Sequence, residues 1–106
     1  MKINYFEHLI QPNLLGELKY LEANKNYTIL HLSNGETKGS GYNLLQFEKI
    51  LASNSSFKRI HRSYIVNMNF VDKINQQGGY LKLLTKEVFP IGKGQIDENL
   101  QIGLNK

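Results

Sequence analysis

A short run of β-forming residues ends at an Asn-Gly pair in the first third of the chain. The segment YTILHLS, residues 27 to 33, is rich in β-branched and aromatic types, and Asn34-Gly35 follows it directly. Asn-Gly between two extended segments is a strong hairpin signal, because both residues accept the positive φ angles that tight hairpin turns need. We therefore predict an antiparallel hairpin, with ETKGSG, residues 36 to 41, as the returning strand.

Two other segments carry weaker strand signals. Residues 17 to 23, ELKYLEA, alternate apolar and charged side chains imperfectly, so their own pattern leaves both strand and helix open. With the hairpin that follows, we predict a hairpin-rich sheet over residues 17 to 41. Residues 57 to 74 have mixed periods, which predict a short strand, a compact or helical turn, and another strand that begins near Val71.

The strand signals continue toward the carboxyl end. Residues 76 to 79, Gln-Gln-Gly-Gly, predict a turn, and a strand is expected from Tyr80 onward. The last strand is expected from Val88. Pro90 places it at the edge of a sheet, because proline has no N–H to donate to a neighbouring strand.

One clear helix is predicted near residues 43 to 52. Asn43 is its candidate N-cap, and the polar run at residues 53 to 56 ends it. A second stretch of helical spacing contains Ile96 and Leu100. The residues that carry the first helical period are Leu44, Phe47, Ile50 and Leu51. We assign Asn67 to a structural turn or cap, and the core to Tyr27, Phe47, Phe57, Ile65, Val66, Leu81 and Leu83.

Length and composition limit the class of protein. A chain of 106 residues is expected to form a single domain, residues 1 to 106. No apolar stretch approaches a membrane span, so a cytoplasmic location is the default. There is no cysteine, and the three histidines lie far apart without metal-ligand spacing. Paired carboxylates, a nucleophile elbow and a dinucleotide fingerprint are also missing, so we expect no enzyme, metal or cofactor.

Positive charge is concentrated in one part of the chain. The formal net charge is +4 and the pI is about 9.3, which favours an anionic partner. No acidic residue lies between Glu48 and Asp72. That interval holds Lys49, Lys58, Arg59 and Arg62.

Residues 57 to 67, FKRIHRSYIVN, resemble the signature of the LytTR DNA-binding family. The surrounding order is similar as well, from Glu22 and Asn26-Tyr27 before a strand to Pro-Ile-Gly-Lys near the carboxyl end. The resemblance runs from about residue 15 to the carboxyl terminus. The chain departs from the family at Gly92-Lys93, where members often have Ser-Arg, and it shows neither the receiver domain nor the membrane segment that usually precedes such domains. We therefore expect a stand-alone form or a domain excised from a longer regulator.

The resemblance implies a mainly β fold, an elongated arrangement of short antiparallel sheets with one clear helix and small helical turns. It also implies sequence-specific binding of double-stranded DNA by a bacterial transcription regulator of the response-regulator type, part of a two-component system. Loops would read successive major grooves, which need only a few well-placed donors and acceptors. The expected partners are double-stranded DNA, bound at paired half-sites, and a receiver domain in a full-length protein, with no membrane partner.

The resemblance assigns DNA contacts to three loops. His61 is interpreted as structural rather than catalytic, because no carboxylate accompanies it in the sequence. The Gly-Lys-Gly around Lys93 does not have the spacing of a phosphate-binding P-loop. The base-contact candidates are Asn24, Lys25, Asn26, Arg62, Lys93 and Gln95, and the phosphate-contact candidates are Arg59, Ser63 and Gly92.

Each of these assignments has a structural alternative. Asn24-Lys25-Asn26 can be an ordinary turn, and Arg62 a solvated side chain. Arg59 and Ser63 can form an ion pair or a hydrogen bond within a turn. For the whole domain, the alternative function is a small β-rich RNA-binding or protein-interaction module. RNA readers stack bases on exposed aromatic residues, whereas aromatic residues here alternate with aliphatic ones as in a core.

Overall fold

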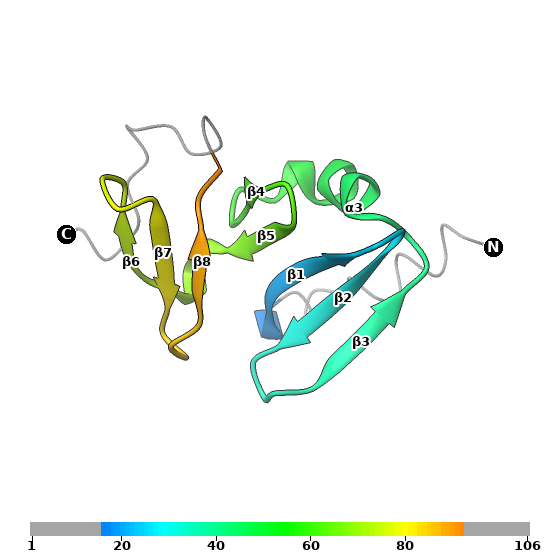
Figure 1. Cartoon of the computed structure of the whole chain (residues 1–106). Coiled ribbons are helices and arrows are strands. Elements are labelled where there is room, and N and C mark those ends of the chain that lie inside the picture. The colour runs from blue at the N-terminus through cyan, green and yellow to red at the C-terminus, as the bar shows by residue number, and fades with distance from the viewer. Residues whose placement is uncertain (1–15, 93–106) are drawn as a thin grey trace.

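The computed structural model describes residues 16 to 92 and is mainly β, as predicted (Figure 1). The described part forms two antiparallel sheets of short strands and one clear helix, which confirms the predicted fold class. No helix within that part is long and apolar enough to cross a membrane. The strands are β1 (Leu18–Asn24), β2 (Tyr27–Leu32), β3 (Thr37–Ser40), β4 (Phe57–His61), β5 (Tyr64–Asn67), β6 (Val71–Asn75), β7 (Tyr80–Leu83) and β8 (Val88–Pro90), and the helices are α3 (Leu44–Ile50) and the 3-10 turns η1 (Leu51–Ser53) and η2 (Met68–Phe70).

The predicted hairpin is formed by β2 and β3 around Asn34-Gly35. Gly35 has a φ of +93°, a backbone conformation that glycine adopts without steric cost. The Asn34 side chain accepts a hydrogen bond of 2.9 Å from the backbone N–H of Glu36. These two features explain why the chain reverses at this point. The hairpin joins β1, β5 and β4 in a five-stranded sheet of order β3-β2-β1-β5-β4.

Tyr27 was predicted in the core, and this prediction is wrong because 43% of its surface is exposed. Alternate residues of β2 face inward, and the buried ones are Thr28, Leu30 and Leu32. Side chains of a strand point to opposite faces in turn, so Tyr27 lies on the face opposite to these three. The other six predicted core residues are buried: Phe47, Phe57, Ile65, Val66, Leu81 and Leu83.

The helix predicted near residues 43 to 52 is α3, continued by η1. The Asn43 side chain accepts a hydrogen bond of 2.8 Å from the backbone N–H of Gln46, and the Gln46 side chain accepts one of 2.9 Å from the backbone N–H of Asn43. This reciprocal capping box satisfies two donors that the first helical turn would otherwise leave free. The helix buries Leu44 and Phe47 against the five-stranded sheet.

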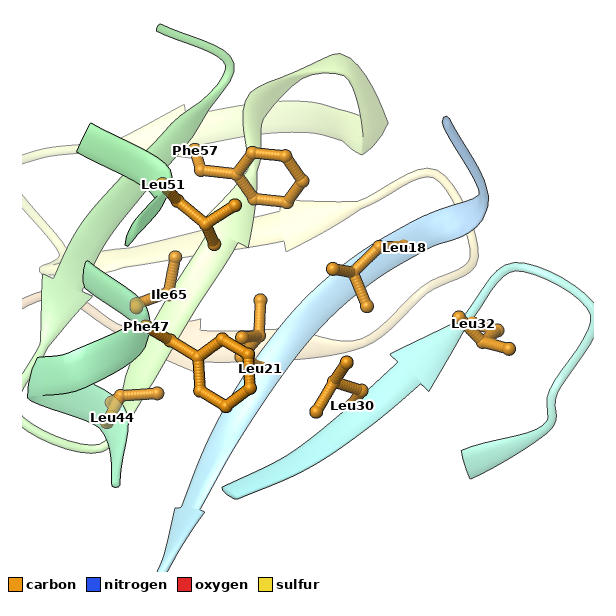
Figure 2. Close-up of a cluster of buried hydrophobic side chains, with 9 residues drawn as sticks. All are labelled: Leu18, Leu21, Leu30, Leu32, Leu44, Phe47, Leu51, Phe57 and Ile65. Carbon is orange, nitrogen blue, oxygen red and sulfur yellow. The ribbon is translucent and has the colours of Figure 1, made fainter. Parts of the chain in front are cut away.

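The side chains under α3 form the first hydrophobic cluster (Figure 2). In that view Phe47 points from the helix toward Leu21 and Leu30 of the neighbouring strands. Removing these surfaces from water is the main stabilising term for this half of the domain. The cluster consists of Leu18, Leu21, Leu30, Leu32, Leu44, Phe47, Leu51, Phe57 and Ile65.

The three-stranded sheet has the order β6-β7-β8, and it lies beside the five-stranded sheet (Figure 1). Strand β8 is at its edge, as Pro90 predicts. The inner face of this sheet forms a second hydrophobic cluster together with residues from β1, β4 and β5. That cluster consists of Tyr20, Ile60, Val66, Val71, Leu81, Leu83 and Phe89.

Strand β1 contributes to both clusters. Leu18 and Leu21 pack in the first cluster, while Tyr20 packs in the second. All four residues from Leu18 to Leu21 are buried, including Lys19. A strand covered on both faces needs no regular alternation of polar and apolar residues. This explains why the sequence left strand and helix open for residues 17 to 23.

Asn67 is a structural cap, as predicted. Its side-chain amide donates a hydrogen bond of 2.9 Å to the carbonyl oxygen of Leu18 in β1. Its side-chain oxygen accepts one of 3.0 Å from the backbone N–H of Asn69 and so caps η2. The buried polar group therefore has partners on both sides, and it ties the end of β5 to the start of β1.

Candidate nucleic-acid interface

The first candidate loop is the two-residue connection between β1 and β2. Asn24 pairs with Tyr27 across the hairpin, so Lys25 and Asn26 alone form the turn. Both turn residues are exposed, and Lys25 has a φ of +56°. Within residues 16 to 92, the side chains of Asn24, Lys25 and Asn26 have no hydrogen-bond partner. Their donors and acceptors therefore face solvent from a short and well-defined turn.

The second candidate loop, Arg62-Ser63, connects β4 to β5. Arg62 is exposed, while His61 and Ser63 beside it are half-buried. The backbone N–H of Ser63 donates a hydrogen bond of 3.1 Å to Nδ1 of His61. His61 therefore braces the turn through its ring, which agrees with its interpretation as structural. The Arg62 side chain projects from this braced turn.

Arg59 lies just before this turn, and its guanidinium group is bonded within the chain. Its Nε donates to the carbonyl oxygen of His61 at 2.9 Å, and one Nη donates to that of Arg62 at 2.7 Å. The other Nη lies 2.6 Å from a carboxylate oxygen of Glu48 in α3. The structure thus shows the ion pair and the turn hydrogen bonds that were the alternative to a phosphate contact, and the phosphate contact stays a prediction.

Glu48 is the residue at this site that sequence reasoning missed. The interval after Glu48 contains no acidic residue, yet α3 lies against the sheet and brings this carboxylate back to Arg59. The available signal was the helical position of Glu48, one residue after the buried Phe47, at the border of the apolar face. The positive charge between Glu48 and Asp72 is therefore partly neutralised at Arg59, whereas Arg62, Lys49 and Lys58 are exposed.

Two backbone hydrogen bonds bring the candidate regions together. The N–H of Ala23, just before the first loop, donates to the carbonyl oxygen of Ser63 in the second at 2.8 Å. The N–H of Gly92 donates to the carbonyl oxygen of Ile60 at 2.6 Å. The end of β1 therefore adjoins the turn between β4 and β5, and the residues just after β8 adjoin β4. The remaining candidates, Lys93 and Gln95, and the helical spacing at Ile96 and Leu100, lie outside the described residues.

The comparisons with known proteins agree with this arrangement. The family model of the LytTr DNA-binding domain matches residues 10 to 101. A solved structure, the LytTr DNA-binding domain of a putative methyl-accepting/DNA response regulator from Bacillus cereus, is 29% identical, with a TM-score of 0.65 over 76% of this chain and 74% of that one. No curated protein matches the chain.

The fold and the match over most of the chain define a DNA-binding domain of the kind found in transcription regulators. The chain belongs to the LytTR family. That family is one of DNA-binding domains and not of enzymes.

Proposed function

We propose that this domain binds double-stranded DNA sequence-specifically and that its loops read successive major grooves. The observation that carries the proposal is the bonding of Ala23 to Ser63 and of Gly92 to Ile60, which connects the first two loops to each other and Gly92 to the strand before the second loop. Loops can replace a recognition helix if their spacing is rigid, because base edges need only a few placed groups. The proposed base contacts are Asn24, Lys25, Asn26, Arg62, Lys93 and Gln95, and the proposed phosphate contacts are Arg59, Ser63 and Gly92.

The exposed side chains suit these roles. An asparagine amide matches the N6 and N7 groups of adenine, and an arginine guanidinium matches O6 and N7 of guanine. Arg62 and Asn26 are exposed at the two turns and have side-chain donors free of partners among residues 16 to 92. Ser63 is only half-buried, so its hydroxyl can reach a phosphate beside them.

The proposal extends to the kind of regulator that contains this domain. The Bacillus cereus protein is described as a response regulator, which supports a bacterial two-component regulator with a receiver domain for this chain too. Such a regulator would act on DNA in the cytoplasm.

We also propose occupancy of paired half-sites by a domain that is monomeric when free. Sedimentation at micromolar concentration tests this, and a stable dimer without DNA would contradict it.

The alternative of an RNA-binding module has less support. Proteins that bind single-stranded RNA stack its bases on exposed aromatic side chains. In the described part of the chain, Tyr27 is the aromatic residue with a large exposed surface. Tyr20, Phe47, Phe57 and Phe89 are buried in the two clusters. Duplex DNA is therefore the better fit.

Selection from a pool of random DNA duplexes tests the proposed function directly. We expect repeated rounds to enrich one motif. The affinity should fall steeply with salt, because each neutralised phosphate lowers the slope of log K against log salt concentration by about 0.9. A pool of single-stranded RNA of equal length is the control. Enrichment from the RNA pool alone, or a binding constant independent of salt, would contradict the proposal.

A further inference from the structure

Arg59 is connected to the second candidate loop more closely than a surface arginine needs to be. All three nitrogens of its guanidinium group donate hydrogen bonds within the chain. Two of the acceptors are consecutive backbone carbonyls, those of His61 and Arg62, and the third is the carboxylate of Glu48. The side chain therefore links helix α3 to the backbone of the turn that carries Arg62.

The chemistry of arginine fits this link. The guanidinium group is planar and rigid, so its N–H donors fix the relative positions of the groups that accept from them. The turn needs such support, because the pairing of β4 with β5 shifts register between Arg59 and His61 and is irregular there. Lysine has a point charge on a flexible stem and cannot hold the two carbonyls and the carboxylate in the same fixed geometry.

Glu48 places a negative charge beside Arg59. Its carboxylate is 44% exposed and lies at the edge of the proposed DNA-binding surface, where a negative charge repels phosphates. On electrostatics alone, this residue weakens binding. Its bond of 2.6 Å to Arg59 suggests a compensating role, since the carboxylate orients the guanidinium group that in turn holds the loop.

We propose that Arg59 is a positioning residue for base recognition, oriented by Glu48, and that it fixes the backbone at residues 61 to 63 so that Arg62 projects in one direction. This inference rests on the proposed function and deepens it. It replaces a general phosphate contact at Arg59 with a specific effect on the base that Arg62 reads.

The test compares Glu48→Gln, Arg59→Lys and Arg62→Ala on the selected duplex and on duplexes changed at one base pair. A bidentate base contact corresponds to roughly 5- to 150-fold in affinity, so a misplaced Arg62 is expected to lose a large part of that factor. We expect Glu48→Gln to bind more weakly than the parent, and Arg59→Lys to lose discrimination at the same base pair as Arg62→Ala. In a protein that already has Arg62→Ala, Arg59→Lys should lower DNA affinity and base discrimination much less than it does in the parent.

A simple phosphate contact predicts the opposite signs. Glu48→Gln would then bind more tightly, because a repulsive charge is removed, and Arg59→Lys would keep its base preference. Either result would overturn the proposal. Glu36→Gln is the matched control for loss of one exposed carboxylate, since Glu36 lies in the β2–β3 turn and its side chain has no partner among the described residues.

A measurement without DNA separates this proposal from the proposed function. NMR order parameters of the Arg62 and Ser63 amides should fall in Glu48→Gln and Arg59→Lys, and stay at parental values in Glu36→Gln. Unchanged values in the first two would overturn the positioning role even if the parent binds DNA well. Lowered values in a protein that binds no duplex would confirm that Arg59 holds the turn and would refute DNA binding.

Discussion

The ammonium group of Lys19 lies 2.7 Å from a carboxylate oxygen of Glu87, and this ion pair joins β1 of the five-stranded sheet to the residue before β8 of the three-stranded sheet. Lys19 also donates a hydrogen bond of 3.2 Å to Thr85. The Lys19 side chain is only 8% exposed, against 30% for Glu87. Burial alone would raise the pKa of Glu87, but hydrogen bonds from Lys19 and Thr85 outweigh it and hold that pKa below its ordinary value.

Replacement of Lys19 by alanine is expected to lower the free energy of unfolding by about 1–3 kcal/mol, because it removes a buried side chain and leaves Glu87 without its cation. Urea unfolding measures this change. Lys19→Met, which retains the length of the side chain without its charge, should cost less. Lys38→Ala, at an exposed position of β3, is the control and should leave stability nearly unchanged. A parental midpoint for Lys19→Ala would show that the ion pair contributes nothing.

Tyr20 gives a prediction at alkaline pH. Burial, followed by the negative charges of Glu87 and Glu22, raises the pKa of its phenol from 10.0 to about 12. Between these values the unfolded chain has lost the phenolic proton while the folded chain retains it. The unfolded state then binds fewer protons, so stability is fully present below pH 10 and falls as the pH rises toward about 12.

Tyr20→Phe removes this titration while it retains the ring. Urea unfolding below and within the window should show that the parent loses more stability with rising pH than Tyr20→Phe does. Parallel loss in the two proteins would mean that the pKa of Tyr20 is not raised.

Arg62→Ala tests the main base contact. We expect affinity for the selected duplex to fall by roughly 1–3 kcal/mol, with relaxed preference at one base pair. Fluorescence anisotropy on a set of single-base variants measures both effects. Thermal unfolding must match the parent, because an arginine stem can also contribute packing. A well-folded Arg62→Ala protein with parental affinity and preference would show that this assignment is wrong.

Lys25→Gly should separate stability from binding. The φ of +56° at Lys25 is unfavourable for an L-residue with a side chain, and glycine relieves this cost. We expect a gain in unfolding free energy of roughly 0.5–1 kcal/mol, reduced by the greater freedom of glycine in the unfolded chain. DNA affinity should fall because a loop cation is lost.

Lys38→Gly is the comparison for this prediction. Lys38 is an exposed strand residue outside the positive-φ region, so glycine should destabilise the protein there. Destabilisation at both positions would indicate that the turn at Lys25 carries no backbone strain.

Local signals in the sequence predicted most of the fold. The β2–β3 hairpin and α3 depend on turn and cap residues a few positions apart, Asn34-Gly35 and Asn43, and both were predicted correctly. The buried face of β2 was harder to predict, because the alternation of buried residues could begin either at Tyr27 or at its neighbour Thr28. The aromatic residue was the natural choice for the core, but the position of Leu30 and Leu32 on the Thr28 face decided the outcome.

Contacts between distant residues could not be predicted from local patterns. The bond from Glu48 to Arg59 requires α3 to lie against the sheet, and the burial of Lys19 requires the second sheet to cover β1. The proximity of the first two loops depends on the pairing of β1 with β5, and that of Gly92 to β4 depends on its bond to Ile60. The resemblance to a family supplied the candidate contact residues, and it gave no indication of the partners that hold them.

Because β1 supplies side chains to both hydrophobic clusters, separation of either cluster from it would expose buried side chains of this strand to water. The two sheets should therefore lose their structure together in one cooperative transition, although each has its own strands and core residues. Hydrogen exchange would show this as similar protection, near the global unfolding free energy, for amides of β5 and β7. The distance from Gly92, at the end of the three-stranded sheet, to the two loops of the five-stranded sheet is then set by a single folding equilibrium and does not vary as it would between two independent lobes.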